Sequence, residues 1–149
     1  MTRGTRARTL HPGVGLGQGV LLVAAGGALG AVARWALTTE FPASAGQFPW
    51  TTLLINVVGS ALLAALPLLS AARHRSWVGL FVGTGVLGGF TTMSTASVDT
   101  FNLLDGHHVV TAVVYCLGTL AAAVAAVLVV DRLTTPSERA AAEDAGWDE

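Results

Sequence analysis

Four long stretches of the chain contain no charged residue, and the charged residues gather between them and at the two ends. The uncharged stretches cover residues 14–33, 41–72, 76–98 and 109–130. Each is long enough for a membrane-spanning helix, which needs about 20 mostly apolar residues. None of them alternates apolar and polar residues as the strands of a membrane barrel do. The pattern predicts an all-α membrane protein with four transmembrane helices. We expect these helices over residues 18–39, 50–70, 77–103 and 108–133.

The composition supports a membrane protein. Of the 149 residues, 52% are hydrophobic and 11% are charged, and the mean hydropathy is +0.63. The net charge of −1 argues against nucleic-acid binding. Little chain remains for a soluble domain. We therefore expect an N-terminal segment over residues 1–17, a transmembrane domain over 18–133, and a polar, disordered C-terminal tail over 134–149.

The first hydrophobic stretch has one feature of a cleaved signal peptide, because arginines at positions 3, 6 and 8 precede it. However, the stretch is long, Arg34 follows it, and no clear cleavage site separates it from the next hydrophobic segments. We interpret it as a membrane span.

The arginines predict how the chain crosses the membrane. All eight basic residues other than histidine are arginines, and seven of them flank the same side of the predicted bundle. These seven are Arg3, Arg6, Arg8, Arg73, Arg75, Arg132 and Arg139. The opposite side has only Arg34, at the end of a helix. The positive-inside rule therefore predicts that both termini are cytoplasmic.

Glycines and hydroxyls are concentrated in the third stretch. Four glycines, at positions 83, 85, 88 and 89, lead into the hydroxyls of Thr91, Thr92, Ser94 and Thr95. This run predicts a helix that is broken in mid-membrane, where freed carbonyls can form a cation site. As an alternative, each hydroxyl can bond back to a carbonyl of its own helix. For the cluster as a whole, we favour a site. In the first stretch, Gly26 and Gly30 form a G-x-x-x-G pattern that favours close helix packing.

Five further polar residues lie within or beside the spans. Asn56 offers two N–H donors that suit an anion, although a hydrogen bond between helices is the competing use. Tyr115 and Thr119 stand one turn apart and place two hydroxyls on one face. Arg34 either extends to the membrane surface or attracts anions to a vestibule. Asp99 needs a hydrogen-bonding or ionic partner, and its ordinary role would be to lock helices together.

Three segments together resemble the Fluc/CrcB family of fluoride channels. They are GGALGAVARW at 26–35, TLLINVVGS at 52–60 and GVLGGFTTMST at 85–95. The resemblance covers the four spans in order. It implies an antiparallel dual-topology dimer with two fluoride pathways. It also implies a structural sodium ion at the dimer centre, held by the backbone carbonyls of Gly88 and Thr91.

The resemblance also assigns roles to polar side chains. Arg34 and Asp99 match charged positions of the family, which would act either at a vestibule or as structural charges. The expected fluoride path comprises Asn56, Thr92, Met93, Ser94, Thr95, Tyr115 and Thr119. These assignments agree with the chemistry of fluoride, a small and strongly hydrated anion that needs replacement donors when it loses water.

Two positions depart from the family pattern. The family has phenylalanines in a TT-F-ST-F arrangement, whereas this chain has Met93 and Ala96, which offer no positive ring edge. An antiparallel dimer of identical chains also requires both orientations, but the seven flanking arginines favour one. We therefore predict a heterodimer in which an oppositely oriented paralogue supplies the phenylalanines.

The sequence thus predicts a fluoride-specific channel of the plasma membrane that passively exports cytoplasmic fluoride and reduces its toxicity. We do not expect an enzyme, because the chain has no nucleotide-binding loop or catalytic triad. One alternative is a non-conducting or assembly subunit of a heterodimeric channel, which Met93 and Ala96 support. A small multidrug exporter fits less well, because proton coupling needs a buried carboxylate in the first span and residues 14–33 contain none.

Overall fold

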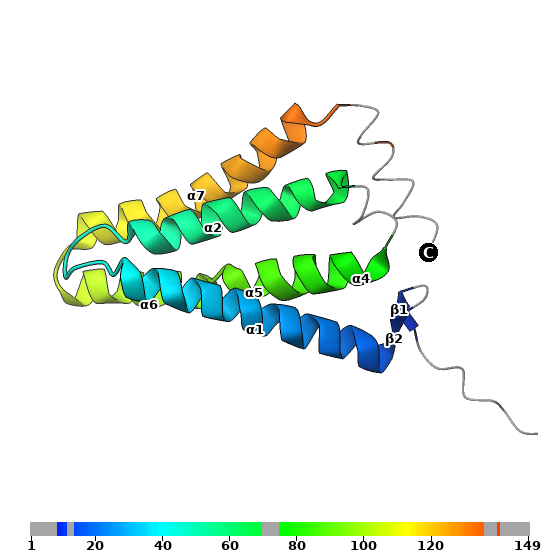
Figure 1. Ribbon diagram of the computed structural model, residues 1–149. Coiled ribbons are helices and arrows are strands. Elements are labelled where there is room, and N and C mark those ends of the chain that lie inside the picture. The colour runs from blue at the N-terminus through cyan, green and yellow to red at the C-terminus, as the bar shows by residue number, and fades with distance from the viewer. Residues whose placement is uncertain (1–8, 12–13, 70–74, 136–139, 141–149) are drawn as a thin grey trace, which may run out of the picture.

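Two short strands precede the helical part of the chain. The computed structural model describes residues 9–11, 14–69, 75–135 and 140 (Figure 1). Strand β1 (Thr9–His11) pairs antiparallel with β2 (Val14–Gly15). The sequence analysis did not predict this pair, because strands of two or three residues are too short to leave a periodic pattern.

Helix α1 (Leu16–Glu40) and helix α2 (Trp50–Ala65) form the first two spans. α1 ends two residues before Pro42. Helical backbone is disfavoured at the residue before a proline, which here is Phe41. α2 gives way to the short 3₁₀ helix η1 (Leu66–Leu68). Pro67, inside η1, has no N–H to continue the α-helical hydrogen bonds. Proline therefore fixes both of these boundaries.

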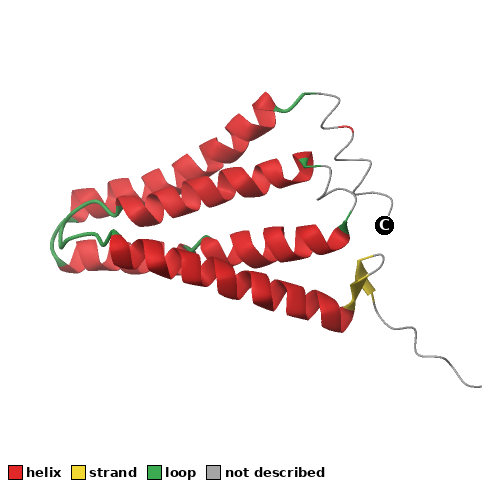
Figure 2. Cartoon of the chain, in the orientation of Figure 1, coloured by secondary structure: helices red, strands yellow, loops and turns green. Residues whose placement is uncertain are grey.

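The third span consists of several helical pieces, and the fourth is one long helix. The third span contains α4 (Ser76–Val78), the π-helix η2 (Gly79–Leu87), α5 (Gly88–Phe90) and α6 (Met93–Asp105). The fourth is α7 (Val109–Leu133). The loops from α1 to α2 and from α6 to α7 lie at the same end of the bundle (Figure 2).

The prediction of an all-α protein with four membrane spans is confirmed. Four helices in the described part of the chain, over residues 16–40, 50–68, 76–105 and 109–133, are long and apolar enough to cross a membrane. Their limits differ from the predicted ones by at most two residues. The predicted topology signals at Arg3, Arg6, Arg8, Arg73 and Arg139 lie outside the described residues, as does most of the predicted tail.

The outside of the bundle is apolar, which suits lipid. Leu21, Val110 and Leu133 are each more than 70% exposed, although a large exposed apolar surface is unfavourable in water. The buried side chains lie mainly where α2, α6 and α7 meet, and Ala112 and Tyr115 are fully buried there. The protein is therefore a multi-pass membrane protein whose apolar side chains mostly face outward.

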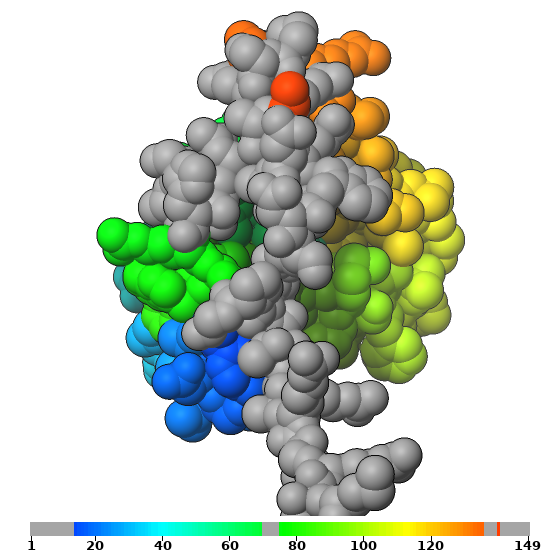
Figure 3. All heavy atoms as spheres, turned by 90° about the vertical axis from the view of Figure 1, so that its right-hand side faces the viewer, coloured from blue at the N-terminus to red at the C-terminus, as the bar shows by residue number. Residues whose placement is uncertain are grey.

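Glycines bring α1 against the third span. A Cβ on Gly30 would overlap the carbonyl oxygen of Val86, and a Cβ on Gly85 would lie 2.9 Å from Gly26 Cα. The prediction that Gly26 and Gly30 allow close helix packing is confirmed. Seen from the end where α1 begins, α1 and α4 lie on one side of the bundle and α7 on the other (Figure 3).

Candidate functional site

The third span is interrupted at Thr91 and Thr92. Thr91 has φ −72° and ψ 153°, and Thr92 has φ −154° and ψ 117°, so both residues are extended. α5 ends just before them at Phe90, and α6 begins just after them at Met93. The interruption lies near the middle of the 76–105 span.

Two backbone N–H groups beside the interruption bond to side chains instead of helical carbonyls. The Thr92 N–H donates to Asn56 Oδ1 at 2.8 Å, and the Thr95 N–H donates to Thr92 Oγ1 at 3.1 Å. In a continuous α-helix these N–H groups would bond the carbonyls of Gly88 and Thr91, four residues earlier. The usual donors to both carbonyls are therefore engaged elsewhere, and oxygen ligands of this kind suit a hard cation.

Asn56 lies directly against the interruption. Its side chain is 5% exposed, and its Nδ2 donates to the Thr92 carbonyl at 3.0 Å while Oδ1 accepts the Thr92 N–H. The amide thus binds both backbone groups of one extended residue, as a neighbouring β-strand would. This pair uses one of the two N–H donors that the sequence analysis assigned to an anion.

The four hydroxyls of the cluster serve different purposes. Thr91 Oγ1 donates to the Leu87 carbonyl at 3.0 Å, which is the local bond that the sequence left open as an alternative. Thr92 Oγ1 lies 3.1 Å from Ser94 Oγ and 3.0 Å from Thr95 Oγ1. Thr92 also caps the N-terminus of α6. Three of the hydroxyls therefore form one polar group at the start of α6.

Arg34 reaches the interruption from α1. Its Nε donates to the carbonyl oxygen of Gly89 at 3.3 Å, and its side chain is half-buried. A cation is favourable at the C-terminal end of a helical run, where carbonyls lack partners. From the sequence we expected Arg34 either to extend to the membrane surface or to attract anions to a vestibule. Its hydrogen bond to the Gly89 backbone was not predicted.

Asp99 joins three spans. Its Oδ2 accepts a hydrogen bond from Thr52 of α2 at 2.7 Å and another from Tyr115 of α7 at 3.1 Å. Tyr115 is fully buried and meets Phe48 edge to face, with ring centroids 5.4 Å apart. Sequence reasoning did not single out Thr52. Its position one helical turn before Asn56 places it on the same face of α2, and this spacing could have indicated a polar contact there.

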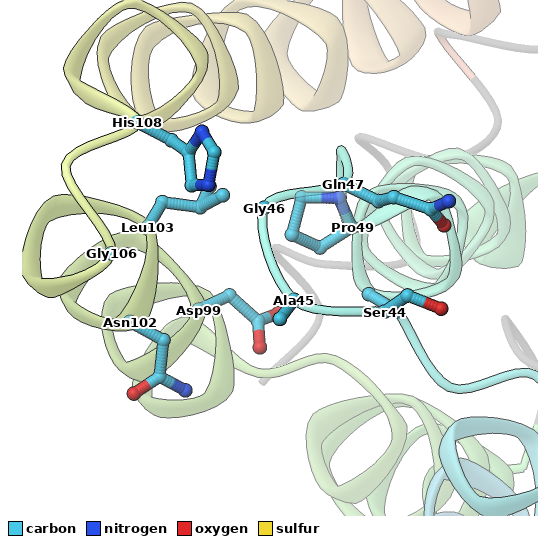
Figure 4. Close-up of a pocket in the computed structure, with 11 residues that line it drawn as sticks. Ser44, Ala45, Gly46, Gln47, Pro49, Asp99, Asn102, Leu103, Gly106 and His108 are labelled. Atoms are coloured by element: carbon cyan, nitrogen blue, oxygen red, sulfur yellow. The ribbon is translucent and has the colours of Figure 1, made fainter.

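A cavity of about 380 Å³, with both polar and apolar lining residues, reaches Asp99 from the end of the bundle that carries the two loops. It is lined by the loop between α1 and α2 and by residues of α6 and the following turn (Figure 4). Asn102 and His108 contribute side chains to the same lining. The cavity gives water or a small ion a route from this end of the bundle to the Asp99 carboxylate.

Thr119 has a buried hydroxyl without a partner. Its side chain is 4% exposed, and among the described residues its Oγ1 is the one buried side-chain polar atom that lacks a hydrogen bond, although it lies close to the Tyr115 hydroxyl one turn earlier. An unsatisfied buried hydroxyl costs about 1–3 kcal/mol. Thr119 lines an open groove of about 250 Å³ between α6 and α7, together with Met93, Ala96 and Cys116. The two positions that depart from the family pattern therefore lie in the groove that Thr119 lines.

The comparisons with known proteins agree on one family. The family described as CrcB-like protein, Camphor Resistance (CrcB), matches residues 21–130. The fluoride-specific ion channel FluC 2 of Streptomyces avermitilis is 47% identical over 104 residues, which cover 68% of this chain and 65% of that protein. The matched segment thus spans just under two thirds of this relative.

Two further relatives are matched over more of their length. The fluoride-specific ion channel FluC of Nitrobacter winogradskyi is 41% identical over 73% of this chain and 89% of its own. The fluoride-specific ion channel FluC 1 of Streptomyces coelicolor is 44% identical over 72% and 71%. The family match includes the interrupted third span and the residues around it, and this four-span membrane protein belongs to the CrcB family.

Proposed function

We propose that the chain is a subunit of a fluoride-specific ion channel that lets cytoplasmic fluoride leave the cell passively. The relatives that carry this name support the proposal. The observation that carries it is the unpartnered, buried hydroxyl of Thr119 beside an open groove. A dehydrated fluoride ion needs hydrogen-bond donors, and this hydroxyl needs a partner.

The fluoride path runs along the groove and the polar start of α6. Thr119 supplies a free donor, Asn56 has a second N–H beyond its pair with Thr92, and Ser94 is exposed. Tyr115 also belongs to the path, and its hydroxyl donates a hydrogen bond to Asp99 at the same time. We assign to this path Asn56, Thr92, Met93, Ser94, Thr95, Tyr115 and Thr119.

A structural sodium ion is part of the same proposal. The carbonyls of Gly88 and Thr91 would hold it, and the engagement of their helical donors by other acceptors supports this fit. A bound cation supplies a fixed positive charge that satisfies carbonyls which lipid cannot hydrate. It remains in place and is not transported.

Export is passive and needs no covalent chemistry. Fluoride enters cells as neutral HF and ionises inside, so a selective pore lowers the internal concentration without coupling to another ion. We place the channel in the plasma membrane with both termini in the cytoplasm, as the flanking arginines favour. The carboxylate of α1 lies at its last residue, Glu40, where it does not suit a proton-coupled drug exporter.

The partner in the channel is an antiparallel second subunit, and we favour an oppositely biased paralogue. Met93 is 67% exposed on the groove, where a phenylalanine edge is absent. The numerals in the names of the two Streptomyces relatives fit organisms with more than one such protein. A second candidate function, a non-conducting assembly subunit, is supported by the same two positions, Met93 and Ala96.

Fluoride efflux from liposomes tests the proposal. The purified chain is reconstituted alone and together with a paralogue that carries the phenylalanines, with chloride as the competing anion. We expect selective fluoride efflux from the mixture, lost when Asn56→Ala is introduced. Efflux from the chain alone would refute the heterodimer but support a channel. No efflux from either preparation would contradict the proposed function.

A further inference from the structure

One face of α2 contacts the third span at consecutive turns, and two of its residues meet the interruption itself. Thr52, Asn56 and Gly59 are spaced four and three residues apart, so they share this face. Asn56 binds both backbone groups of Thr92. A Cβ on Gly59 would overlap the methyl group of Thr91, so the glycine makes room for that residue. α2 is therefore shaped to fit extended residues in the third span.

Two acceptors compete for the Thr92 N–H. In a continuous helix the acceptor would be the Gly88 carbonyl, and here it is Asn56 Oδ1. The hydrocarbon core of the bilayer contains no third acceptor for this N–H. An unpaired backbone group is very unfavourable there. If the amide is removed, re-forming the helical bond is the way left to satisfy this N–H. The Gly88 carbonyl would then regain its helical donor.

We propose that Asn56 is a positioning residue that holds the third span open from the neighbouring helix and so keeps the Gly88 carbonyl free for a cation. This inference rests on the cation site of the proposed function. It gives Asn56 a role through Thr92, in addition to any contact with the ion path. Arg34 assists from α1 by holding the Gly89 carbonyl, but it does not touch Thr92.

The proposal predicts a measurable length change. An extended residue rises about 3.3 Å and a helical residue about 1.5 Å, so closing the interruption shortens the span by about 4 Å. Spin labels on cysteines introduced at Thr84 and Val98, which are both exposed, bracket the interruption. The native Cys116 is replaced by serine, and labelled chains are diluted with unlabelled ones so that one intramolecular distance is read.

We expect Asn56→Ala to shorten this distance by about 4 Å, the difference between two extended and two helical residues. Thr52→Val is the matched control. It removes a side-chain hydrogen bond from the same face of α2, but that bond goes to Asp99 and leaves Thr92 untouched. The control should keep the wild-type distance.

Asn56→Asp is the second variant. Burial in a membrane interior favours the neutral form of an aspartic acid at position 56, and its C=O and O–H offer the same acceptor and donor as the amide. It should keep the wild-type distance. If Asn56→Ala does not fold, Asn56→Asp decides the question. A wild-type distance then supports the proposal, and a shortened distance or loss of the folded protein overturns it.

Sodium dependence provides a readout that is independent of transport. Thermal unfolding in detergent is followed while sodium replaces N-methylglucamine. Asn56→Ala should need at least about tenfold more sodium for half of the stabilisation, because a carbonyl ligand has been withdrawn. An unchanged distance and unchanged sodium dependence, together with lost fluoride efflux, would overturn the positioning role. If sodium does not stabilise the wild-type protein, the cation site fails, and the spin-label distances alone decide the role of Asn56.

Discussion

The third span meets α1 and α2 in two different ways. Against α1 the contact is made by backbone, because Gly26 and Gly30 let the main chains of α1 and of η2 and α5 approach closely. Towards α2 and α7 the contact is made by polar side chains, with Asn56 on Thr92 and with Thr52 and Tyr115 on Asp99. The first contact is sensitive to side-chain volume. The second is sensitive to hydrogen-bonding groups, and it binds both backbone groups of Thr92 in the interruption.

The largest expected effect comes from added volume on the glycine side. Gly30→Val should destabilise the protein by about 3 kcal/mol, because its Cβ would overlap the Val86 carbonyl and neither main chain can move freely. Unfolding in a mixed detergent series measures the loss. Gly118→Ala on α7, where no atom lies within 4 Å of the added Cβ, is the control and should be neutral or slightly stabilising. Equal stability of the two variants would show that α1 does not pack as described.

A smaller loss is expected on the polar side. Asp99→Ala removes the acceptor of two hydroxyls and should destabilise the protein by about 2 kcal/mol. Both hydroxyls donate to the same oxygen, Oδ2, so the amide oxygen of Asp99→Asn can accept both bonds, and this variant should lose no more than about half as much stability in the same unfolding assay. If the asparagine variant is as unstable as the alanine variant, the charge of Asp99 matters more than its role as acceptor.

The smallest effect on stability, and the sharpest on function, is expected at Thr119. Thr119→Val keeps the side-chain volume and removes the hydroxyl without a partner, so the variant should be about 1 kcal/mol more stable than wild type, the lower end of the cost of such a hydroxyl. Fluoride efflux from the channel should fall about tenfold, which corresponds to a lost donor worth about 1.4 kcal/mol. Undiminished efflux would remove Thr119 from the fluoride path and leave its unsatisfied hydroxyl unexplained.

The spans could be predicted closely from the sequence, whereas the partners of the polar residues could not. Hydrophobic length alone fixes where a helix can cross lipid, and the observed spans follow it. The pairing of Asn56 with Thr92 and of Arg34 with Gly89 depends on which helix faces meet, which a single span does not encode. Thr52 was missed for the same reason, because one threonine in a span looks like any other until its neighbour is known.

The three-way contact at Asp99 has a consequence for biosynthesis. The ribosome delivers Thr52 with the second span, Asp99 with the third and Tyr115 with the fourth. Until α7 is inserted, the carboxyl group of Asp99 has one of its two hydroxyl donors, and a poorly satisfied polar group within the bilayer is unfavourable. A chain that stops before the fourth span therefore carries a built-in defect. Insertion of the fourth span removes that defect, because Tyr115 then supplies the second donor.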